Sequence, residues 1–531
     1  MAQAQLLEGQ SGLPVDNPTK SYWHKEPSSK LLGHRTTKEL PRSADVVIVG
    51  SGITGSFAAH FLKEKQPDLN VVMVEAREAC SGATGRNGGH CQPAIYASKP
   101  HIASFELRNF LYLKELVEDL SIPCDWRSTS GVHAFYSKEL FGTCRKIVDK
   151  LTEHYPDLAA NVAVVKKGKK GEGDLSGSPA YLIEGERREL TLHGLRIPHA
   201  EGAIVQWNAA SLWPYKLIAF VLERLLAANG GESKGSFNLQ TSTPVTGLSR
   251  AETSANLSSP GDSKTRKHNS IWTVHTPRGT IVTSQVLLAT NGYTSHLLPQ
   301  FSDLLVPTRG QISALKPPET PTDPADPPLD IAHTYYLVGE PVDPYSRDDY
   351  LVQRPPPAAE LVFGGGRQHA AGRGIGVWDD SGIDESVSWY LRGELSNAID
   401  LSLHHTQSQS PGEKASLRKV DLEPTFEWSG IMGYTRDSHP WVGGVPASLG
   451  GGSGLWLCAG YTGHGMPNAV LSAKAVVDML LADDDDDVEI DLPPEYELTE
   501  RRVNHVRGAW EEVAVADAKG SLYLDFGPQR G

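Results

Sequence analysis

The sequence has few cysteines, no long apolar run and no excess of basic residues, and each shortage excludes a class of protein. Its five cysteines, Cys80, Cys91, Cys124, Cys144 and Cys458, are scattered and never spaced as CxxC, which argues against a disulfide framework or a zinc site. No apolar run reaches the roughly 18 residues that a membrane span needs. With a formal net charge of −14, the chain lacks a basic field for nucleic acid or an anionic membrane. We therefore expect neither partner, and no metal site.

Targeting signals are also missing from both ends of the printed sequence. The first residues, MAQAQLLEGQSGLPVDNPTK, have no basic stretch followed by an apolar one, as a secretory signal requires. The last residues, FGPQRG, match no retention or peroxisomal address. These features, together with the cysteine usage, predict a cytoplasmic protein.

The composition is that of a globular protein, with 39% hydrophobic and 21% charged residues among 531. Since domains run roughly 100–200 residues, this length predicts at least two. Residues 1–44 are polar and contain proline, and we interpret them as an arm laid over the surface. Six polar segments rich in Ser, Pro, Gly or charge are interpreted as solvated loops: 166–170, 168–179, 253–270, 316–328, 404–416 and the acidic run 483–487.

A βαβ unit follows the arm. DVVIVG (45–50) and NVVMVE (70–75) are short apolar runs, typical of strands buried on both faces. ITGSFAAHFLKEK (53–65), between them, has apolar residues at helical spacing. A glycine motif, GSGITG (50–55), joins the first strand to the helix, which is the context in which GxGxxG indicates a dinucleotide site.

Each residue of this motif has a physical reason to be there. Gly50 permits the tight turn, Gly52 lets the backbone approach a pyrophosphate, and Gly55 lets helix and strand pack closely. The helix N-terminus then faces the phosphate charge. Glu75 closes the second strand, where a carboxylate accepts hydrogen bonds from a ribose diol and repels a 2′-phosphate. An ordinary glycine-rich turn is the structural alternative.

Two further glycine-rich segments suggest a long cofactor. CSGATGRNGGH (80–90) provides small residues whose backbone N–H groups can line the cofactor, and Arg86 adds a positive charge near phosphate or flavin. TIVTSQVLLATNGYTS (280–295) is predicted to be a strand pair, and GLWLCAGYTGHGM (454–466) a strand followed by a glycine turn. Three such segments predict one cofactor threaded through a discontinuous domain.

These motifs resemble the FAD-dependent amine and amino-acid oxidoreductases of the D-amino acid oxidase superfamily, and their pattern is most similar to gamma-glutamylputrescine oxidoreductase-like proteins. The matching segments follow the order found in that family: VVIVGSGITG with Glu75, then SGATGRNGGH (81–90), LATNGYT (288–294), PTRGQ (307–311), ELVFGGGR (360–367), GYTRDSHPWVGG (433–444) and GYTGHGM (460–466).

The resemblance implies an α/β fold, α+β overall, with a Rossmann-like FAD-binding domain and an inserted mixed-sheet substrate domain. The expected FAD-binding segments are 45–100, 200–300 and 420–480, the substrate segments are 101–199 and 301–419, and 481–531 is an acidic C-terminal tail. The expected cofactor-binding residues are Gly50, Gly52, Ile53, Thr54, Gly55, Glu75, Ala76, Arg77, Ala83, Thr84, Arg86, Asn87, Gly88, Gly89, His90, Val245, Thr290, Gly463, His464, Gly465 and Met466.

The resemblance also implies the chemistry. In this family a hydride passes from the carbon beside an amine nitrogen to flavin N5, and the protein binds, orients and tunes. No catalytic triad is needed and none is found. The positions that correspond to covalent flavin attachment in relatives carry Arg86 and Gly430 here, which predicts non-covalent FAD, although His90 lies close to the first of them.

The segment WSGIMGYTRD (428–437) bears on the substrate. It resembles the glycine oxidase segment that carries a carboxylate-clamping arginine, and Met432 stands at that position. An arginine clamps a carboxylate by charge-assisted bidentate hydrogen bonds, whereas methionine offers apolar contact. We therefore predict an amine substrate, not a simple α-amino acid. Arg309, Arg367 and Arg436 are alternative clamps.

Several other residues are candidates for the site. His464 is expected to donate a hydrogen bond to flavin O2 or N3, with a more distant supporting role as the alternative. His90, His464 and Met432 are the candidate site-lining residues, with the flavin carrying the reaction. Three aromatics, Trp207, Trp213 and Tyr215, can line an amine pocket by cation–π contact, but core packing is the preferred interpretation.

The sequence thus predicts an FAD-dependent oxidoreductase that converts the C–N bond of a small amine to an imine, with oxygen or another compound as electron acceptor. Three alternatives stay open. They are an α-amino acid oxidase with a relocated arginine, a natural-product tailoring enzyme for a bulky substrate, and a non-catalytic FAD-binding protein.

Overall fold

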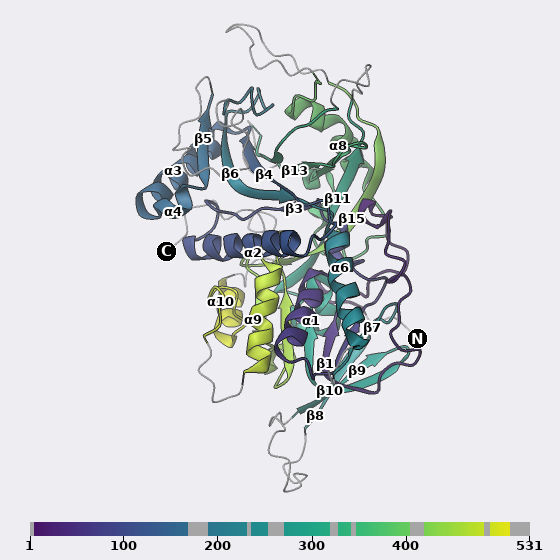
Figure 1. Cartoon of the computed structure of the whole chain (residues 1–531). Helices are drawn as coiled ribbons and strands as arrows, with labels where there is room; N and C mark the ends of the chain where they lie inside the picture. Colours follow the sequence, from purple (N-terminus) through teal and green to yellow (C-terminus); the bar gives the residue numbers. More distant parts are fainter. Residues whose placement is uncertain are drawn as a thin grey trace.

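A computed structural model describes residues 5–167, 190–230, 235–252, 270–318, 328–340, 347–403, 419–482 and 489–509. Helices and two β-sheets build the molecule, with one sheet in the lower half of Figure 1 and the other in the upper half. The predicted loops 168–179 and 404–416 and the acidic run 483–487 lie outside the described residues, as do most of 166–170, 253–270 and 316–328.

The first sheet has eight strands and a parallel centre, in the order β16-β17-β10-β1-β2-β7. Its strands are β1 (Ser43–Val49), β2 (Val71–Val74), β7 (Phe237–Gln240), β8 (Gly247–Glu252), β9 (Ser270–Thr276), β10 (Gly279–Leu288), β16 (Trp441–Gly444) and β17 (Leu455–Ala459). The apolar residues of β1 and β2 are buried because helices cover one face of the sheet and other segments of the chain cover the opposite face. This is the predicted Rossmann-like arrangement.

Helix α1 (Ile53–Lys65) connects β1 to β2 over the range that the sequence predicts. It packs between α6 (Pro214–Ala227) and α9 (Ala469–Leu481), and Figure 1 shows the three side by side against the first sheet. Helix α2 (Pro100–Asp119) crosses above them, between the two sheets, and contacts α9. The remaining α-helices of the described residues are α3 (Lys138–His154), α4 (Pro156–Ala159), α7 (Thr294–Leu297), α8 (Glu385–Ala398) and α10 (Glu500–Ala509).

The prediction of a strand pair at 280–295 is wrong. One strand, β10, runs to Leu288 and is followed by the short helices η5 (Asn291–Tyr293) and α7. The antiparallel partner of β10 is the upstream strand β9, joined to it by a turn before Gly279, which has a φ of +131°. Because β10 also pairs with β1 and β17, its apolar end is buried at the centre of the sheet and cannot fold back on itself.

The second sheet has nine strands in the order β15-β11-β14-β13-β12-β4-β6-β3, with β5 paired to β6. The strands are β3 (His90–Cys91), β4 (Arg127–Phe135), β5 (Val162–Lys166), β6 (Gly202–Ser211), β11 (Leu305–Leu315), β12 (Thr334–Val338), β13 (Asp348–Gln353), β14 (Leu361–Gly364) and β15 (Pro424–Thr435). Since β12 and β4 are parallel and the other pairs antiparallel, the predicted mixed sheet is confirmed.

The chain passes repeatedly between the two sheets. Strands β6 and β15 belong to the second sheet, yet they open the segments 200–300 and 420–480 that the sequence assigns to FAD binding. Each of these two segments therefore contributes strands to both sheets. Which sheet a strand joins depends on pairing with strands remote in sequence, and local composition carries no signal of that pairing.

The N-terminal arm is more buried than its sequence indicates. Tyr22 and Trp23, in η1 (Tyr22–His24), are 2% and 0% exposed. Their rings lie 5.6 and 5.9 Å from Trp213, between centroids. The arm is mostly exposed or half-buried, and these two aromatics anchor it by burying apolar area against the core.

Candidate functional site

A cavity of about 1520 Å³ is lined by residues of both sheets. The carboxyl ends of β1, β2 and β10 line one part of it, and β11, β12, β13 and β15 line another. In open parallel sheets ligands bind outside the carboxyl ends of the strands. The topology thus places the glycine-rich turns and the second sheet around one space.

The turn from β1 to α1 fits the role assigned to its glycines. Gly50 has a φ of +107°, and a Cβ there would lie 2.7 Å from the Ala289 carbonyl oxygen. A Cβ at Gly55 would lie 2.0 Å from the Gly50 carbonyl oxygen, so Gly55 serves helix–strand packing and does not line the cavity. Gly52 caps α1 without a side chain, which leaves the positive end of the helix open to the cavity.

Glu75 lies at the end of β2 and lines the same part of the cavity. Its carboxylate accepts hydrogen bonds from the Ser51 N–H at 3.0 Å, the Ser51 hydroxyl at 2.7 Å and the Arg77 N–H at 3.0 Å. These contacts hold the carboxylate in a fixed orientation. The sequence analysis missed Ser51, although its position inside the glycine motif was a usable signal.

Three neighbouring donors hold the segment 83–90, which contains η2 (Ala83–Arg86). The carbonyl of Gly85 accepts from Ser21 at 2.7 Å, that of Arg86 from Trp428 at 2.8 Å, and that of Asn87 from Trp23 at 2.6 Å. Because the carbonyls are bound on the protein side, the segment keeps one backbone orientation along the cavity.

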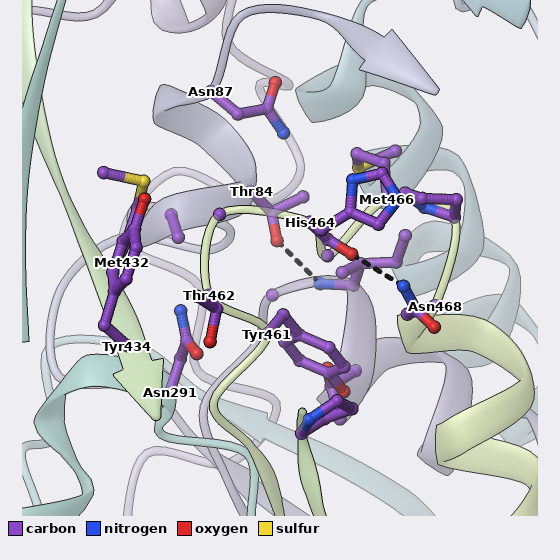
Figure 2. Close-up of a pocket in the computed structure, with 18 of the residues that line it drawn as sticks. Thr84, Asn87, Asn291, Met432, Tyr434, Tyr461, Thr462, His464, Met466 and Asn468 are labelled. Carbon is purple, nitrogen blue, oxygen red and sulfur yellow. Dashed lines mark hydrogen bonds between the residues drawn. The ribbon is translucent and has the colours of Figure 1, made fainter. Parts of the chain in front are cut away.

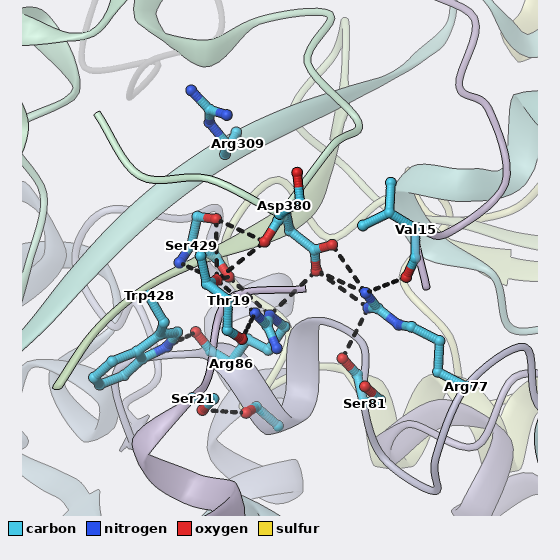
Figure 3. Close-up of polar contacts among 12 residues, drawn as sticks. Val15, Thr19, Ser21, Arg77, Ser81, Arg86, Arg309, Asp380, Trp428 and Ser429 are labelled. Atoms are coloured by element: carbon cyan, nitrogen blue, oxygen red, sulfur yellow. Dashed lines mark hydrogen bonds and ion pairs between the residues drawn. The ribbon is translucent and has the colours of Figure 1, made fainter. Parts of the chain in front are cut away.

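Arg86 lines the cavity and forms an ion pair within the protein, and its role as a positive charge near phosphate or flavin stays a prediction. Its Nε lies 3.2 Å from the Asp380 carboxylate and donates to the Ser429 carbonyl at 2.7 Å. Arg77 pairs with the same carboxylate at 2.8 Å, and Figure 3 shows both guanidinium groups converging on Asp380. Asp380 is far from both in sequence and was missed, since nothing in its local pattern marks it.

The turn after β17 contributes His464 and Met466 to the cavity. The His464 Nε2 lies 3.0 Å from the carboxylate of Glu106, which also accepts from the Ala94 N–H at 2.6 Å and from Asn468 at 3.0 Å. Burial alone would lower the pKa of His464, but the charge and hydrogen bond of Glu106 raise it. A carboxylate on the apolar face of α2 was the signal that could have identified Glu106.

The second sheet supplies the rest of the lining. Met432 and Tyr434 project from β15, and Figure 2 shows them across the view from His464 and Asn468. Met432 comes close to Gly310 and Gly463: its Cε would lie 2.8 Å from a Cβ at Gly310, and its Sδ 3.7 Å from one at Gly463.

Among the three candidate arginines, Arg367 lines the cavity and donates to the Tyr434 hydroxyl at 2.5 Å. Arg309 and Arg436 do not line it. Arg309 donates to the Asp379 carbonyl at 3.4 Å, and Arg436 to the Asp303 carbonyl.

The remaining predicted residues divide into lining and supporting positions. Trp207, Trp213 and Tyr215 are buried in the hydrophobic core outside the cavity, which agrees with the preferred interpretation that they serve core packing. Gly89 also lies outside it, against the Trp23 ring. His90 lines the cavity, and burial lowers its pKa to about 3. The other predicted cofactor-binding residues that line it are Ile53, Thr54, Ala76, Arg77, Ala83, Thr84, Arg86, Asn87, Gly88, Val245, Thr290, Gly463 and Gly465.

The described residues contain no group of three or more His, Cys, Asp or Glu side chains that could hold a metal ion. Within the same residues, no helix combines the length and apolarity needed to cross a bilayer.

The cavity fits a dinucleotide. A side chain at Gly50 would meet the Ala289 backbone, α1 presents its N-terminus, and the Glu75 carboxylate is fixed at the end of β2. These features suit a pyrophosphate and a ribose. The cavity continues past the segment 83–90 to the second sheet, which leaves space for a flavin and a substrate.

Comparison with known proteins gives the family. The model of the family described as FAD dependent oxidoreductase (DAO) matches residues 45–479. No curated protein sequence matches the chain.

Solved structures show the same fold. L-amino acid deaminase from Proteus vulgaris, lacking its specific insertion sequence, is 17% identical with a TM-score of 0.56, covering 90% of this chain and 99% of its own. Glycine oxidase from Geobacillus kaustophilus is 17% identical with a TM-score of 0.58, covering 86% and 99%. Iminodiacetate oxidase from Chelativorans sp. BNC1 is 14% identical with a TM-score of 0.56, covering 86% and 99%. Because the family model spans most of the sequence, the chain belongs to the DAO family of FAD-dependent oxidoreductases, with FAD as its cofactor.

Proposed function

We propose that the protein oxidises the C–N bond of an amine to an imine, with oxygen or another compound as the final acceptor. Bound FAD would supply the hydride-accepting chemistry. The residues of this chain would bind the cofactor along Gly50, Gly52, Glu75 and the segment 83–90, and would orient the amine against the second sheet.

The observation that carries this proposal is the Met432 side chain in the cavity. It extends from β15 opposite Thr308 of β11, at the position where the resemblance to glycine oxidase expects a carboxylate-binding arginine. A thioether gives apolar, adaptable contact and no charge. A carboxylate on the reacting carbon would lose a paired charge, which typically costs several kcal/mol in a buried site.

The second candidate is oxidation of an α-amino acid. Two of the similar structures are named L-amino acid deaminase and glycine oxidase, and Arg367 lines the cavity of this chain. In this candidate Arg367 would bind the substrate carboxylate in place of Met432. The tailoring of a bulky natural-product intermediate is a further alternative.

Anaerobic flavin reduction separates these candidates. The purified holoenzyme is mixed under nitrogen with mono-, di- and polyamines and their acylated forms, and separately with α-amino and N-methyl amino acids. Bleaching of the oxidised flavin band by amines alone supports the proposal. Bleaching by amino acids alone supports the second candidate, and bleaching by neither points to a bulkier substrate or a non-catalytic protein.

A variant sharpens the experiment. Met432→Arg introduces a guanidinium into the cavity, so we expect α-amino acids to bleach its flavin at least tenfold faster than they bleach the wild type. Met432→Leu keeps the position apolar and serves as the matched control. A Met432→Arg protein that binds FAD but reacts with amino acids no faster than Met432→Leu would contradict the role given to this position.

We also propose that the FAD is held without a covalent bond. The Arg86 side chain is engaged by Asp380, and Gly430 has no side chain to form a link. Acid precipitation is expected to release all the flavin into the supernatant, and flavin that stays with the pellet would contradict this.

The five cysteines are unpaired and buried, which supports a cytoplasmic location.

A further inference from the structure

Two adjacent acidic residues begin β13, and among the described residues they differ in their partners. Asp349 accepts from Arg347 at 2.8 Å, from the Tyr390 hydroxyl at 2.6 Å and from the Gly366 N–H at 2.8 Å. Asp348 points to the other face of the strand and lines the cavity. Within the described part of the chain, no hydrogen bond or ion pair joins its carboxylate to another residue. The Asp348 side chain is half-buried, and a carboxylate partly removed from water is costly unless something pairs with it.

Aromatic rings surround this carboxylate. Tyr350 lies two residues further along β13 and Tyr336 stands opposite Tyr350 on β12, so both project to the face that Asp348 shares. Both line the cavity, as does Tyr434. Burial raises the pKa of Tyr336 and Tyr350, and the Asp348 charge raises it further, which keeps them neutral phenols.

This group of residues lies beside the cofactor segment. Gly364 and Gly88 make room for the Tyr350 ring, whose atoms would lie 2.4 and 2.3 Å from a Cβ at each position. The Tyr350 ring also lies 5.7 Å from the His90 ring, between centroids. Asp348 is therefore close in the fold to the segment 83–90, on the substrate side of the cavity.

We propose that Asp348 binds a cationic nitrogen of the ligand, with the faces or hydroxyls of Tyr336 and Tyr350 beside it. A carboxylate ringed by aromatic side chains has the chemistry that recognises an ammonium group. This inference rests on the proposed function, because it names the charged group by which an amine substrate is recognised. A neutral or anionic ligand would leave the carboxylate unpaired.

Asp348 is charged at neutral pH, as this role requires. Burial raises its pKa to about 6, against the lowering effect of Arg367 and Arg373 and with a further raising effect of Asp349. Arg367 belongs to η7 (Arg367–His369) and Arg373 to η8 (Ala371–Gly374), and no ion pair joins Arg367 to Asp348 in the described residues. Asp348 is therefore mainly a carboxylate above pH 6.

Binding of choline and of its neutral isostere, 3,3-dimethylbutan-1-ol, tests the proposal without any turnover. Each compound is titrated into the oxidised holoenzyme at pH 8, and the visible flavin spectrum reports binding. We expect choline to bind at least tenfold more tightly than the isostere, and Asp348→Asn to abolish that difference. Asp330→Asn, which removes an exposed carboxylate with a side chain 61% accessible, is the matched control and should retain it.

Either of two results would overturn the proposal: no preference for choline in the wild type, or the same preference in a folded Asp348→Asn protein. If Asp348→Asn fails to retain FAD, the wild type is titrated at several pH values instead. The preference for choline over the isostere should then fall as the pH drops below about 6, and a preference that does not change would count against Asp348. Since this readout requires no oxidation, its failure is distinct from a failure of amines to bleach the flavin.

Discussion

At single positions in this protein, glycine is required because a side chain would collide with neighbouring atoms. Gly55 is the sharpest case, because the obstructing atom is a backbone oxygen, 2.0 Å from where a Cβ would sit. Backbone in a tight turn cannot move aside as a flexible side chain can. Both the GxGxxG pattern and the surrounding backbone require glycine at this position.

Gly55→Ala should therefore destabilise the turn that holds the dinucleotide. We expect the unfolding free energy to fall by about 1–3 kcal/mol or more, the usual range for overpacking, and the FAD content of the purified protein to fall with it. Chemical denaturation and the flavin-to-protein absorbance ratio measure the two effects.

Gly142→Ala is the control, since a Cβ in this α3 position would meet nothing within 4 Å. Alanine is favoured over glycine in a helix by up to about 1 kcal/mol, so this variant should be unchanged or slightly more stable. A Gly55→Ala protein as stable and as rich in FAD as Gly142→Ala would refute the packing argument.

Helix α2 connects the two sheets through one side chain of its buried face. Glu106 is 2% exposed and holds both His464 and Asn468 of the segment that follows β17. Both Glu106 and His464 line the cavity, so the contact joins two elements at its border. Its energetic contribution depends on pH, because one partner is a histidine.

The sign of that dependence follows from the raised pKa of His464. The stabilisation is fully present below the ordinary histidine value of 6.5 and is lost as the pH rises through the higher folded-state value. Glu106→Gln should cost roughly 1.5–3 kcal/mol where the histidine is charged, as for hydrogen bonds to charged groups. The cost should be smaller at pH 9 than at pH 6, and denaturation at both values measures it.

Glu115→Gln is the matched control for this element. It lies on the same helix but is exposed, so its stability should follow the wild type at both pH values. An equal loss in Glu106→Gln at pH 6 and pH 9 would show that the histidine charge contributes nothing.

Across the whole molecule, Asp380 joins three distant parts of the chain. Its fully buried carboxylate binds Arg77 after β2 and Arg86 beside the cavity. Thr19 of the N-terminal arm donates its hydroxyl to the Asp380 carbonyl at 3.0 Å, and Arg86 also donates to that hydroxyl at 2.7 Å. The arm, the first sheet and the second sheet therefore meet at one charge cluster.

Asp380→Asn should be among the most destabilising single changes outside the cavity. Removing one partner of a buried ion pair costs about 3–5 kcal/mol, because the remaining charges are left uncompensated. Chemical denaturation of the holoenzyme measures the loss. Asp421→Asn, an exposed residue, should cost less than about 0.5 kcal/mol, and equal stabilities of the two variants would contradict the clustering argument.

Local sequence patterns were sufficient to predict the first βαβ unit. Glycine spacing, the apolar runs and Glu75 identify the turn and its cofactor, because strand, turn and helix signals there lie within about thirty residues, the size of one such unit. The residues 280–295 were misjudged, because the choice between one strand and two depended on β9 and β17, which are remote in sequence.

The glycine motif and the apolar runs were enough to predict the cofactor class and the Rossmann-like sheet, because backbone geometry at glycines and the ends of buried strands is a local property. Only the tertiary structure decided which charges are available to a ligand. Arg86 pairs with Asp380, Glu106 binds His464, and Asp348 faces the cavity. These outcomes depend on partners more than a hundred residues away or on which side of a strand faces the space between the sheets, and charge pairing at that distance leaves no periodic trace in the chain.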